Sequence, residues 1–307
     1  MVHENNIKRQ EFLFVYETKD CNPNGDPMDE DKVRVDPITK QAIVTDVRIK
    51  RTIRDYLIKK YENKENNDNI FVARRHNNEG KIFTKTDTLE EFGLNKKVKK
   101  MDLTKKFLDI RLFGITLAER GENEEDNISV PITGPVQIRI SRSLNEVEQT
   151  LIKGTSVFPS ASDKGQGTFT QRYIIPYGIF PIYGFFNQYS AEETQTTQED
   201  LDKMYEALYF GTKELSTRSK IGHNPIFLVV IEYNQEHDKF FIGGLDNLIS
   251  IEKKSRIRSL TEARLSLADL NAQIQANSKK IEKVKLLKNG EWKEFVKKEE
   301  IEGITLG

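Results

Sequence analysis

The sequence predicts an α+β fold whose elements follow the order strand, helix, strand, strand, helix, strand. Two kinds of pattern predict it. Four segments are rich in aromatic and β-branched residues, which favour strands. Two others place apolar residues at the spacing of a helix that is buried on one side. This βαββαβ order is that of the ferredoxin-like fold, which RRM-type RNA-binding domains adopt, but many functions share it.

The first strand is expected at residues 11–18, and the first helix begins after Thr45. Thr45 is a good N-cap, and Asp46 suits the positive end of the helix dipole. The apolar residues of this helix recur at i, i+4, i+7 and i+8, which predicts one core-facing stripe. They are Ile49, Ile53, Tyr56 and Leu57. The second helix is expected at residues 198–213, and its inner face comprises Leu201, Met204, Tyr205, Leu208 and Tyr209.

The other three strands are expected at residues 128–141, 169–187 and 225–233. In the first of these, Val136, Ile138 and Ile140 alternate with polar residues, which is typical of a half-buried strand. The aromatic residues of the second could stack on nucleic-acid bases, but at strand spacing a place in the core is favoured. They are Phe180, Tyr183, Phe185 and Phe186.

Several segments lie outside this order. Residues 63–100 are rich in Asn and Lys and are too polar for a core of their own, which predicts an insertion of marginal order. Residues 103–114 are expected to form a short helix. A further helix is expected near residues 259–277. Lys288-Asn289-Gly290 then predicts the turn of a β-hairpin.

Composition limits the class of protein. The 48 basic and 48 acidic residues cancel, which argues against a wholly basic nucleic-acid-coating protein but allows one basic groove. One cysteine excludes an intrachain disulfide and indicates a reducing compartment. No apolar run approaches the ~20 residues of a membrane helix, and the N-terminus lacks the apolar segment of a signal peptide. We therefore expect a cytoplasmic protein without a membrane partner.

A candidate phosphate site lies where the loop at residues 22–27 meets the first helix. The loop has the Asn-Gly and Pro residues of tight turns, and a helix N-terminus beside such a loop binds anions. The helix carries four cations in its first turns: Arg48, Lys50, Arg51 and Arg54. This pattern predicts a protein that holds a nucleic-acid backbone. A solvated basic face over a core stripe is the alternative, and the two are about equally supported by the residues alone.

Metal binding is not favoured. The loop partly satisfies an EF-hand pattern, but a strand precedes it and Asp31 stands where a bidentate Glu is expected. The matching residues are Asp20, Asn22, Asn24, Gly25 and Asp31. The four histidines share no ligand spacing with Cys21, so no zinc site is expected. They are His3, His76, His223 and His237. We assign no metal and no cofactor.

Several separated motifs carry a family resemblance. In chain order they are NPNGDP (22–27), VRVDPITKQAIVTDVRIKRTIRDYL (33–57), DIRLFG (109–114), PITGPVQIRISRSLN (131–145) and STRSKIGHNP (216–225). Together they resemble the Cas7 family of CRISPR-associated proteins, in the Csh form (Csh2) of type I-B systems. The resemblance covers about residues 10–250.

This resemblance implies an RRM-like palm over residues 1–250, with a finger insertion at about 63–103 and a thumb at about 141–173. Residues 251–307 would pack on the palm as a helix and hairpin. It implies a non-catalytic backbone subunit of a Cascade surveillance complex in antiviral defence. The implied partners are CRISPR RNA, the target DNA strand, other copies of the chain in a helical filament, and other Cascade subunits. Base pairing would read sequence while the protein holds the guide backbone.

The resemblance also implies a set of guide-binding residues. The helix motif would place Thr45, Arg48, Lys50 and Arg51 near guide phosphates. The loop residues Asn22, Asn24 and Gly25 would approach the same backbone through their amides. The implied thumb contacts are Arg142, Lys164, Gln166 and Arg172, and Arg218 and Lys220 follow on weaker grounds.

Two rival functions remain open at this point. Related backbone subunits of type III effectors cleave target RNA with a metal and an acidic loop residue, for which Asp26 is the candidate here. Such chemistry needs convergent carboxylates, which spacing alone cannot show. The type I resemblance implies no cleavage, so we assign no catalytic residue. The other rival is a structural, polymerising protein that binds no nucleic acid.

Overall fold

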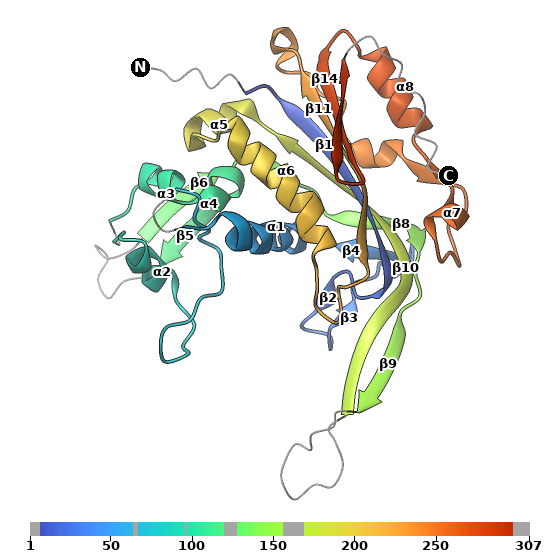
Figure 1. Cartoon of the computed structure of the whole chain (residues 1–307), viewed down its shortest axis with the longest axis horizontal. Coiled ribbons are helices and arrows are strands. Elements are labelled where there is room, and N and C mark those ends of the chain that lie inside the picture. Colours follow the sequence, from blue (N-terminus) through green and yellow to red (C-terminus); the bar gives the residue numbers. More distant parts are fainter. Residues whose placement is uncertain (1–6, 64–66, 96, 120–127, 156–168, 297–307) are drawn as a thin grey trace, which may run out of the picture.

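The computed structural model describes residues 7–63, 67–95, 97–119, 128–155 and 169–296. A central antiparallel sheet has the strand order β15-β14-β11-β1-β10-β7, and β9 pairs with the part of β10 that leaves this sheet (Figure 1). The fold is therefore mixed α+β, as expected. Its strands are β1 (Gln10–Cys21), β7 (Val136–Ile138), β9 (Thr150–Thr155), β10 (Phe169–Phe186), β11 (His223–Tyr233), β14 (Ile281–Lys288) and β15 (Glu291–Val296).

Two long helices, α1 (Asp46–Tyr61) and α6 (Gln198–Lys213), cover one face of the sheet (Figure 1). Thr45 caps α1, since its hydroxyl accepts a hydrogen bond from the amide of Arg48. The predicted stripes of both helices are buried in one core with the side chains that β1 directs to this face. Both helix predictions are confirmed. The short α5 (Gln188–Thr194) precedes α6.

The opposite face of the sheet is covered by the C-terminal part of the chain. Because side chains alternate along a strand, β1 buries Phe12 and Phe14 under the helices and Leu13 and Val15 on this second face. The covering elements are η3 (Leu245–Leu248), β12 (Ser250–Ile251), α7 (Leu260–Ala263), β13 (Leu265–Ser266) and α8 (Ala268–Ala276), and the exposed η2 (Gln235–His237) precedes them.

The C-terminal predictions were half right. The single helix expected near residues 259–277 is wrong, because Arg264 adopts a left-handed backbone (φ 52°) that ends α7, and β13 then pairs with β12. The hairpin is confirmed as β14 and β15. Asn289 and Gly290 both have positive φ, as a two-residue type I′ turn requires.

The insertion has more structure than expected. Phe71, Leu89, Phe92 and Val98 are buried in a third core, so the expectation of marginal order is wrong, although the segment has no core of its own, as expected. These sparse apolar residues suffice because the other half of the core comes from residues 103–132. The elements are α2 (Lys85–Glu91), α3 (Lys100–Lys106), α4 (Leu108–Phe113), β5 (Gly114–Glu119) and β6 (Ile128–Thr133). The short helix expected at residues 103–114 is divided at Phe107, whose backbone is extended.

The strand expected at residues 128–141 is three separate strands. β6 pairs with β5 outside the central sheet, β7 contributes three residues to that sheet, and β8 (Ser141–Glu146) pairs with β4 (Gln41–Val44). The break falls at Gly134, where an added Cβ would lie 2.2 Å from the backbone of Phe113. Only glycine allows this crossing. Ile140 is consequently half exposed, against the predicted alternation.

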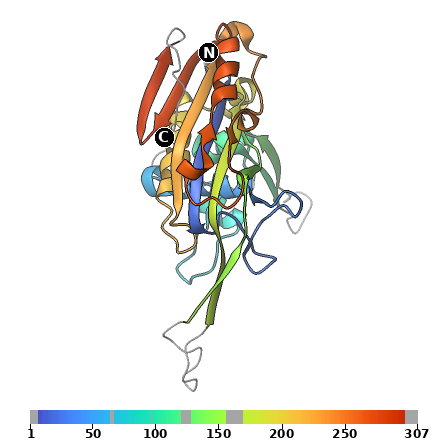
Figure 2. The same ribbon diagram turned by 90° about the vertical axis from the view of Figure 1, so that its right-hand side faces the viewer.

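The strand predicted at residues 169–187 is confirmed as β10, whose first residues project from the body of the molecule as a two-stranded arm with β9 (Figures 1 and 2). The rest of β10, from Ile175 to Phe186, pairs with β1 in the central sheet. Its aromatic side chains lie in the core, with Phe180, Tyr183 and Phe186 buried and Phe185 half-buried. The core interpretation of this group is therefore confirmed.

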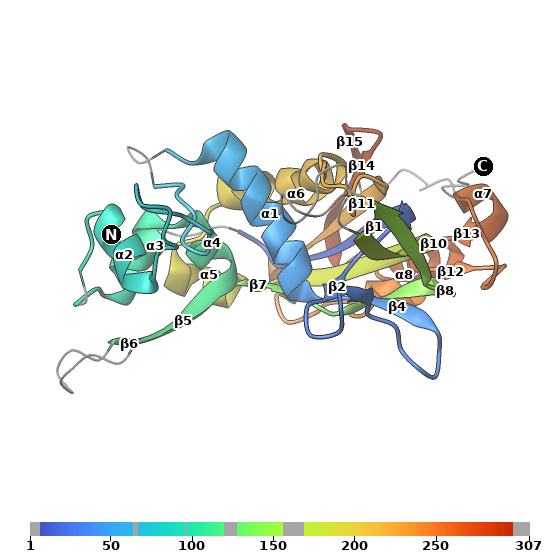
Figure 3. The same cartoon turned by 90° about the horizontal axis from the view of Figure 1, so that it is seen from below.

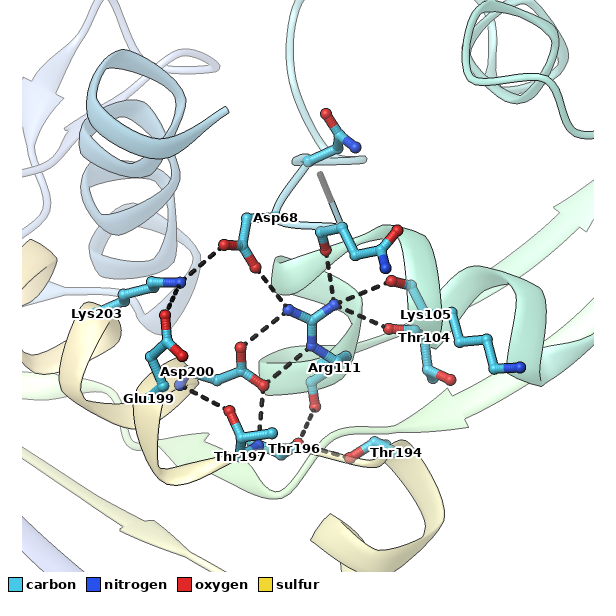
Figure 4. A network of polar contacts seen from close by, with 12 residues as sticks. Asp68, Thr104, Lys105, Arg111, Thr194, Thr196, Thr197, Glu199, Asp200 and Lys203 are labelled. Atoms are coloured by element: carbon cyan, nitrogen blue, oxygen red, sulfur yellow. Dashed lines mark hydrogen bonds and ion pairs between the residues drawn. The ribbon is translucent and has the colours of Figure 1, made fainter. Parts of the chain in front are cut away.

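A buried polar network joins the insertion to the helix layer. Arg111 of α4 binds Asp200 of α6 through two hydrogen bonds and also binds Asp68, which in turn pairs with Lys203 (Figure 4). The same guanidinium donates to the carbonyl of Thr104 at 3.1 Å. The network fixes the third core against α6.

Among the described residues, none of the helices has the length and apolar character needed to span a membrane.

Candidate nucleic-acid interface

Four segments meet at the end of the sheet that carries the arm. They are the loop at residues 22–36, the start of α1, the base of the arm, and residues 214–222 between α6 and β11. The loop contains the short strands β2 (Gly25–Asp26) and β3 (Lys32–Val33), and Figure 3 shows β2 beside the first turn of α1. Hydrogen bonds join the segments: the amide of Asn22 donates to the carbonyl of Ser219 (2.9 Å), and Arg172 of the arm donates to the carbonyl of Arg218 (3.0 Å).

Asn24 fixes the loop to the helix. Its Oδ1 accepts hydrogen bonds from the amide and the hydroxyl of Thr45, at 3.2 and 3.1 Å. The side chains of Asn22 and Asn24 are buried, and Gly25 is half-buried in the β2–β3 pair. Side chains so engaged shape the loop, and this is compatible with the prediction that the loop acts through its backbone.

Arg48 and Lys220 are two cations with no carboxylate partner. The Nη1 of Arg48 donates to the hydroxyl of Thr52 at 2.5 Å, and the Nζ of Lys220 donates to the carbonyl of Asn22. Within the described ranges, neither cation forms an ion pair. Burial lowers the pKa of Arg48, and burial together with the nearby Arg48 charge lowers the pKa of Lys220 to about 7. Charges held in this way favour an incoming anion.

His223 lies beneath these cations. Its ring stacks on Tyr16 at 5.5 Å between centroids, and its Nδ1 lies 2.7 Å from the carbonyl of Lys220 and 3.6 Å from Sγ of Cys21. Burial and the Lys220 charge lower the pKa of His223 to about 3, so the ring is neutral at pH 7. The contact with Cys21 joins residues 202 positions apart, which sequence spacing could not indicate.

Buried polar atoms without partners gather at this end of the fold. Buried polar groups normally have hydrogen bonds, so such a concentration indicates a place for a ligand or water. In the described part of the chain, the orphan atoms here are Thr18 Oγ1, Asn22 Oδ1, Arg34 Nε, Arg172 Nε and His223 Nε2. Three of these residues, Thr18, Arg34 and His223, were not among the predicted site residues. The alternation of Arg34 with two valines was a usable signal, because it predicts an outward-facing cation.

Other predicted cations already have intramolecular partners. Lys50 pairs with Asp46 at 3.0 Å, and the exposed Arg51 pairs with Asp55 at 2.7 Å. The exposed Arg142 of β8 pairs with Asp36 at 3.2 Å. Exposed pairs are weak, so a phosphate could replace the carboxylate.

Arg54 does not belong to this surface. Its Nε lies 2.8 Å from Oδ2 of Asp109, and both side chains are buried. Counting Arg54 among the cations of the phosphate site was therefore wrong, because the helix turns this residue toward α4. Lys164 and Gln166 lie outside the described residues.

The acidic loop residues do not converge. Asp26 accepts a hydrogen bond from the amide of Met28 and pairs with Arg34 at 3.0 Å, while Asp29 pairs with Lys32. Across the described ranges, no group of three or more His, Cys, Asp or Glu side chains could hold a metal ion. β2 and β3 pair within the loop, which is unlike the helix-flanked loop of an EF-hand.

Comparisons with known proteins agree with the sequence motifs. The sequence profile described as CRISPR-associated protein Cas7 matches residues 8–271. A Haloferax volcanii protein named CRISPR-associated protein Cas7 is 32% identical over 92% of this chain and 88% of its own length.

Solved structures also align with the chain. A chain of a CRISPR RNA-guided surveillance complex in a pre-nicking state is 11% identical, with a TM-score of 0.48 over 88% of this chain and 89% of its own. A chain of another CRISPR RNA-guided surveillance complex is 12% identical, with a TM-score of 0.45 over 87% of this chain and 84% of its own. On the extent of the profile match and the identity to the curated relative, this chain belongs to the Cas7 family of CRISPR-associated proteins.

Proposed function

We propose that this chain is a non-catalytic backbone subunit of a type I-B Cascade surveillance complex, and that it binds CRISPR RNA at the end of the sheet described above. The observation that carries the proposal is the pair Arg48 and Lys220, two cations that form no ion pair with any described residue and lie beside buried polar atoms to which the described part of the chain offers no hydrogen bond. Such a site suits a phosphodiester, because the protein supplies charge that it does not itself neutralise. Family membership supports RNA as the occupant.

In this proposal the central sheet and its two helices are an RRM-like palm. The order β11-β1-β10-β7 with α1 and α6 on one face supports this, because it is the strand order of a βαββαβ unit. The segment at about residues 63–103, which shares the third core with residues 103–132, would be the finger, and the arm of β9 and β10 the thumb. A thumb that projects from the palm could fold over a bound strand.

The proposed partners are CRISPR RNA, the target DNA strand, further copies of the chain and other Cascade subunits. The protein would hold the guide backbone while base pairing selects the target DNA strand. Further copies of the chain and other Cascade subunits would adjoin it along the RNA. The assignment to type I-B, in its Csh form, depends on the five sequence motifs. A cytoplasmic location is proposed because a single cysteine indicates a reducing compartment.

The test is a binding titration of a fluorescently labelled single-stranded RNA by anisotropy at several salt concentrations. We expect the affinity to fall as salt rises, because bound cations release counterions from the phosphates. Arg48→Ala with Arg172→Ala should weaken binding at least tenfold and reduce the steepness of the salt dependence. These two side chains come from α1 and from the arm, which the proposal places on one RNA strand.

The matched control is Lys253→Ala with Lys254→Ala. This variant removes the same charge from an exposed segment that is bonded to Glu146, at the end of β8 that is farther along the chain from Arg142. It should bind RNA within about twofold of the wild type. Equal loss in both double variants would show a general charge effect, and unchanged affinity of the first variant, with a native circular dichroism spectrum, would contradict the proposed site.

A further inference from the structure

The environment of Lys220 disfavours the charged form of its side chain. Its Nζ has the carbonyl of Asn22 as hydrogen-bond acceptor, and the cation of Arg48 stands nearby on α1. An ammonium group that is largely removed from water and near a second cation is most stable without its proton. In the free protein, Lys220 is therefore divided between its charged and neutral forms near pH 7, since its pKa is lowered to about 7.

The titratable groups around Lys220 come from four elements. They are Arg48 of α1, Cys21 of β1, Asp31 of the loop before β3, and His223 of β11. Burial raises the pKa of Cys21 to about 11, and burial lowers the pKa of His223 to about 3. Tyr16, which borders Arg48, also has a raised pKa because it is buried. Changes of charge between pH 7 and 9 in this group therefore centre on Lys220.

We propose that Arg48 and Lys220 form one seat for a backbone phosphate of the bound RNA, and that seating this phosphate charges Lys220 by the uptake of one proton from solvent. This proposal rests on the proposed function and adds a proton-linked phosphate site to it. The geometry that carries it is that Lys220 donates to a carbonyl oxygen and Arg48 to a hydroxyl, and that neither cation forms an ion pair within the described residues. Asp31 is the nearby carboxylate whose charge acts on Lys220.

The linkage has a definite sign. A phosphate beside Lys220 supplies the negative charge that the free site lacks, which favours the protonated ammonium. Below pH 7 the lysine is charged before RNA arrives, so no proton is taken up. Above pH 7 the neutral lysine must gain a proton on binding, and the affinity falls as pH rises, by up to tenfold per pH unit for one linked proton.

The carbonyl of Asn22 has a part in this seat. It accepts the hydrogen bond of Lys220, and its residue is held by the amide contact to Ser219 and by Nδ2 donating to the carbonyl of Asp31 at 2.7 Å. The loop therefore keeps the lysine close to the first turn of α1 in the absence of RNA. Lys220 is positioned before the phosphate arrives.

The experiment measures affinity for a labelled single-stranded RNA by anisotropy between pH 7.0 and 8.5 at fixed salt, in the full-length protein. We expect the wild-type affinity to fall at least fivefold across this range. Lys220→Arg keeps the charge but does not titrate, because guanidinium is always protonated. It should bind with a pH dependence of less than twofold, and Lys220→Met should weaken binding at pH 7.0 at least fivefold.

A second measurement detects the proton itself. RNA is added to the wild-type protein in weakly buffered solution at pH 8.0, where uptake close to one proton per bound protomer is expected, and Lys220→Arg should take up none. Wild-type affinity that is flat between pH 7.0 and 8.5, or a Lys220→Arg variant as pH-dependent as the wild type, would overturn the proton linkage. Lys220→Met binding as tightly as the wild type would overturn the seat. Absence of RNA binding at every pH would instead refute the proposed function.

Discussion

Arg111 and Asp200 form a two-point ion pair that joins α4 to α6. Nε and Nη2 of the guanidinium lie 3.0 and 2.9 Å from the two carboxylate oxygens, and both residues are buried (Figure 4). Asp200 also accepts a hydrogen bond from the amide of Thr197, the N-cap residue, and so completes the capping box of α6. One carboxylate thereby contacts both the start of α6 and the third core.

Removal of this carboxylate should destabilise the fold. We expect Asp200→Ala to lower the free energy of unfolding by about 2–4 kcal/mol, because the guanidinium of Arg111 keeps only Asp68 as a counter-charge and α6 loses the carboxylate half of its capping box. Urea unfolding followed by circular dichroism measures the change. Glu252→Ala, which breaks the exposed pair with Arg264, is the matched control and should cost less than about 1 kcal/mol. Similar losses in the two variants would contradict a special role of the buried pair.

The N-cap of α1 should contribute to stability and to the shape of the site. Thr45→Ala removes the acceptor of the Arg48 amide and the hydroxyl that donates to Asn24, and we expect a loss of about 1 kcal/mol. Thr45→Ser keeps the hydroxyl and should be nearly neutral. Hydrogen exchange should show faster opening of the first turn of α1 in the alanine variant alone. Equal exchange in both variants would argue against the cap.

Lys220 should make stability depend on pH. The pKa of its folded form is about 7 and its unfolded pKa is near the ordinary 10.4, so the unfolded chain binds more protons between these values. The contribution of Lys220 to stability therefore rises with pH from about 7 to about 10. Lys220→Met removes the desolvated cation and should stabilise the protein at pH 6.5 by on the order of 2 kcal/mol. The gain should shrink at pH 9, and thermal unfolding of both proteins at the two pH values checks it.

Bound RNA should remain intact. Asp26 is engaged with Arg34 and a backbone amide, and we expect no cleavage of labelled RNA on incubation with magnesium. Gel electrophoresis of the RNA over several hours provides the measurement. Magnesium-dependent cleavage that Asp26→Ala abolishes, with Asp29→Ala unaffected as the matched control, would favour the ribonuclease instead.

The regular elements were predictable where local pattern decides them. The stripe of α1 and the long apolar β11 follow from residue spacing alone. The third core was not predictable, because the few apolar residues of the polar segment, among them Phe71 and Leu89, show no regular spacing and complete their core with residues 103–132. The break of β6 from β7 depends on a backbone crossing at Gly134 that no periodicity records.

The site was predictable only in part. The cap at Thr45 and the cation Arg48 follow from the helix pattern, but the same pattern grouped Arg54 with them, although a carboxylate 55 residues away holds that side chain in the core. The pairing of Lys220 with the loop at Asn22 joins residues 198 positions apart. Such contacts depend on the strand order of the sheet, which the residues near either site do not specify.

The central claim is that this chain holds CRISPR RNA, and its most direct test is the RNA that accompanies the protein. The protein is purified from a host that expresses its CRISPR array, and the co-purifying RNA is sequenced and the particle sized. We predict discrete repeat–spacer RNAs in a particle much larger than one protomer, and their loss in the Arg48→Ala, Arg172→Ala variant. Heterogeneous host RNA in the same amount from both proteins, or no RNA at all, would contradict the claim.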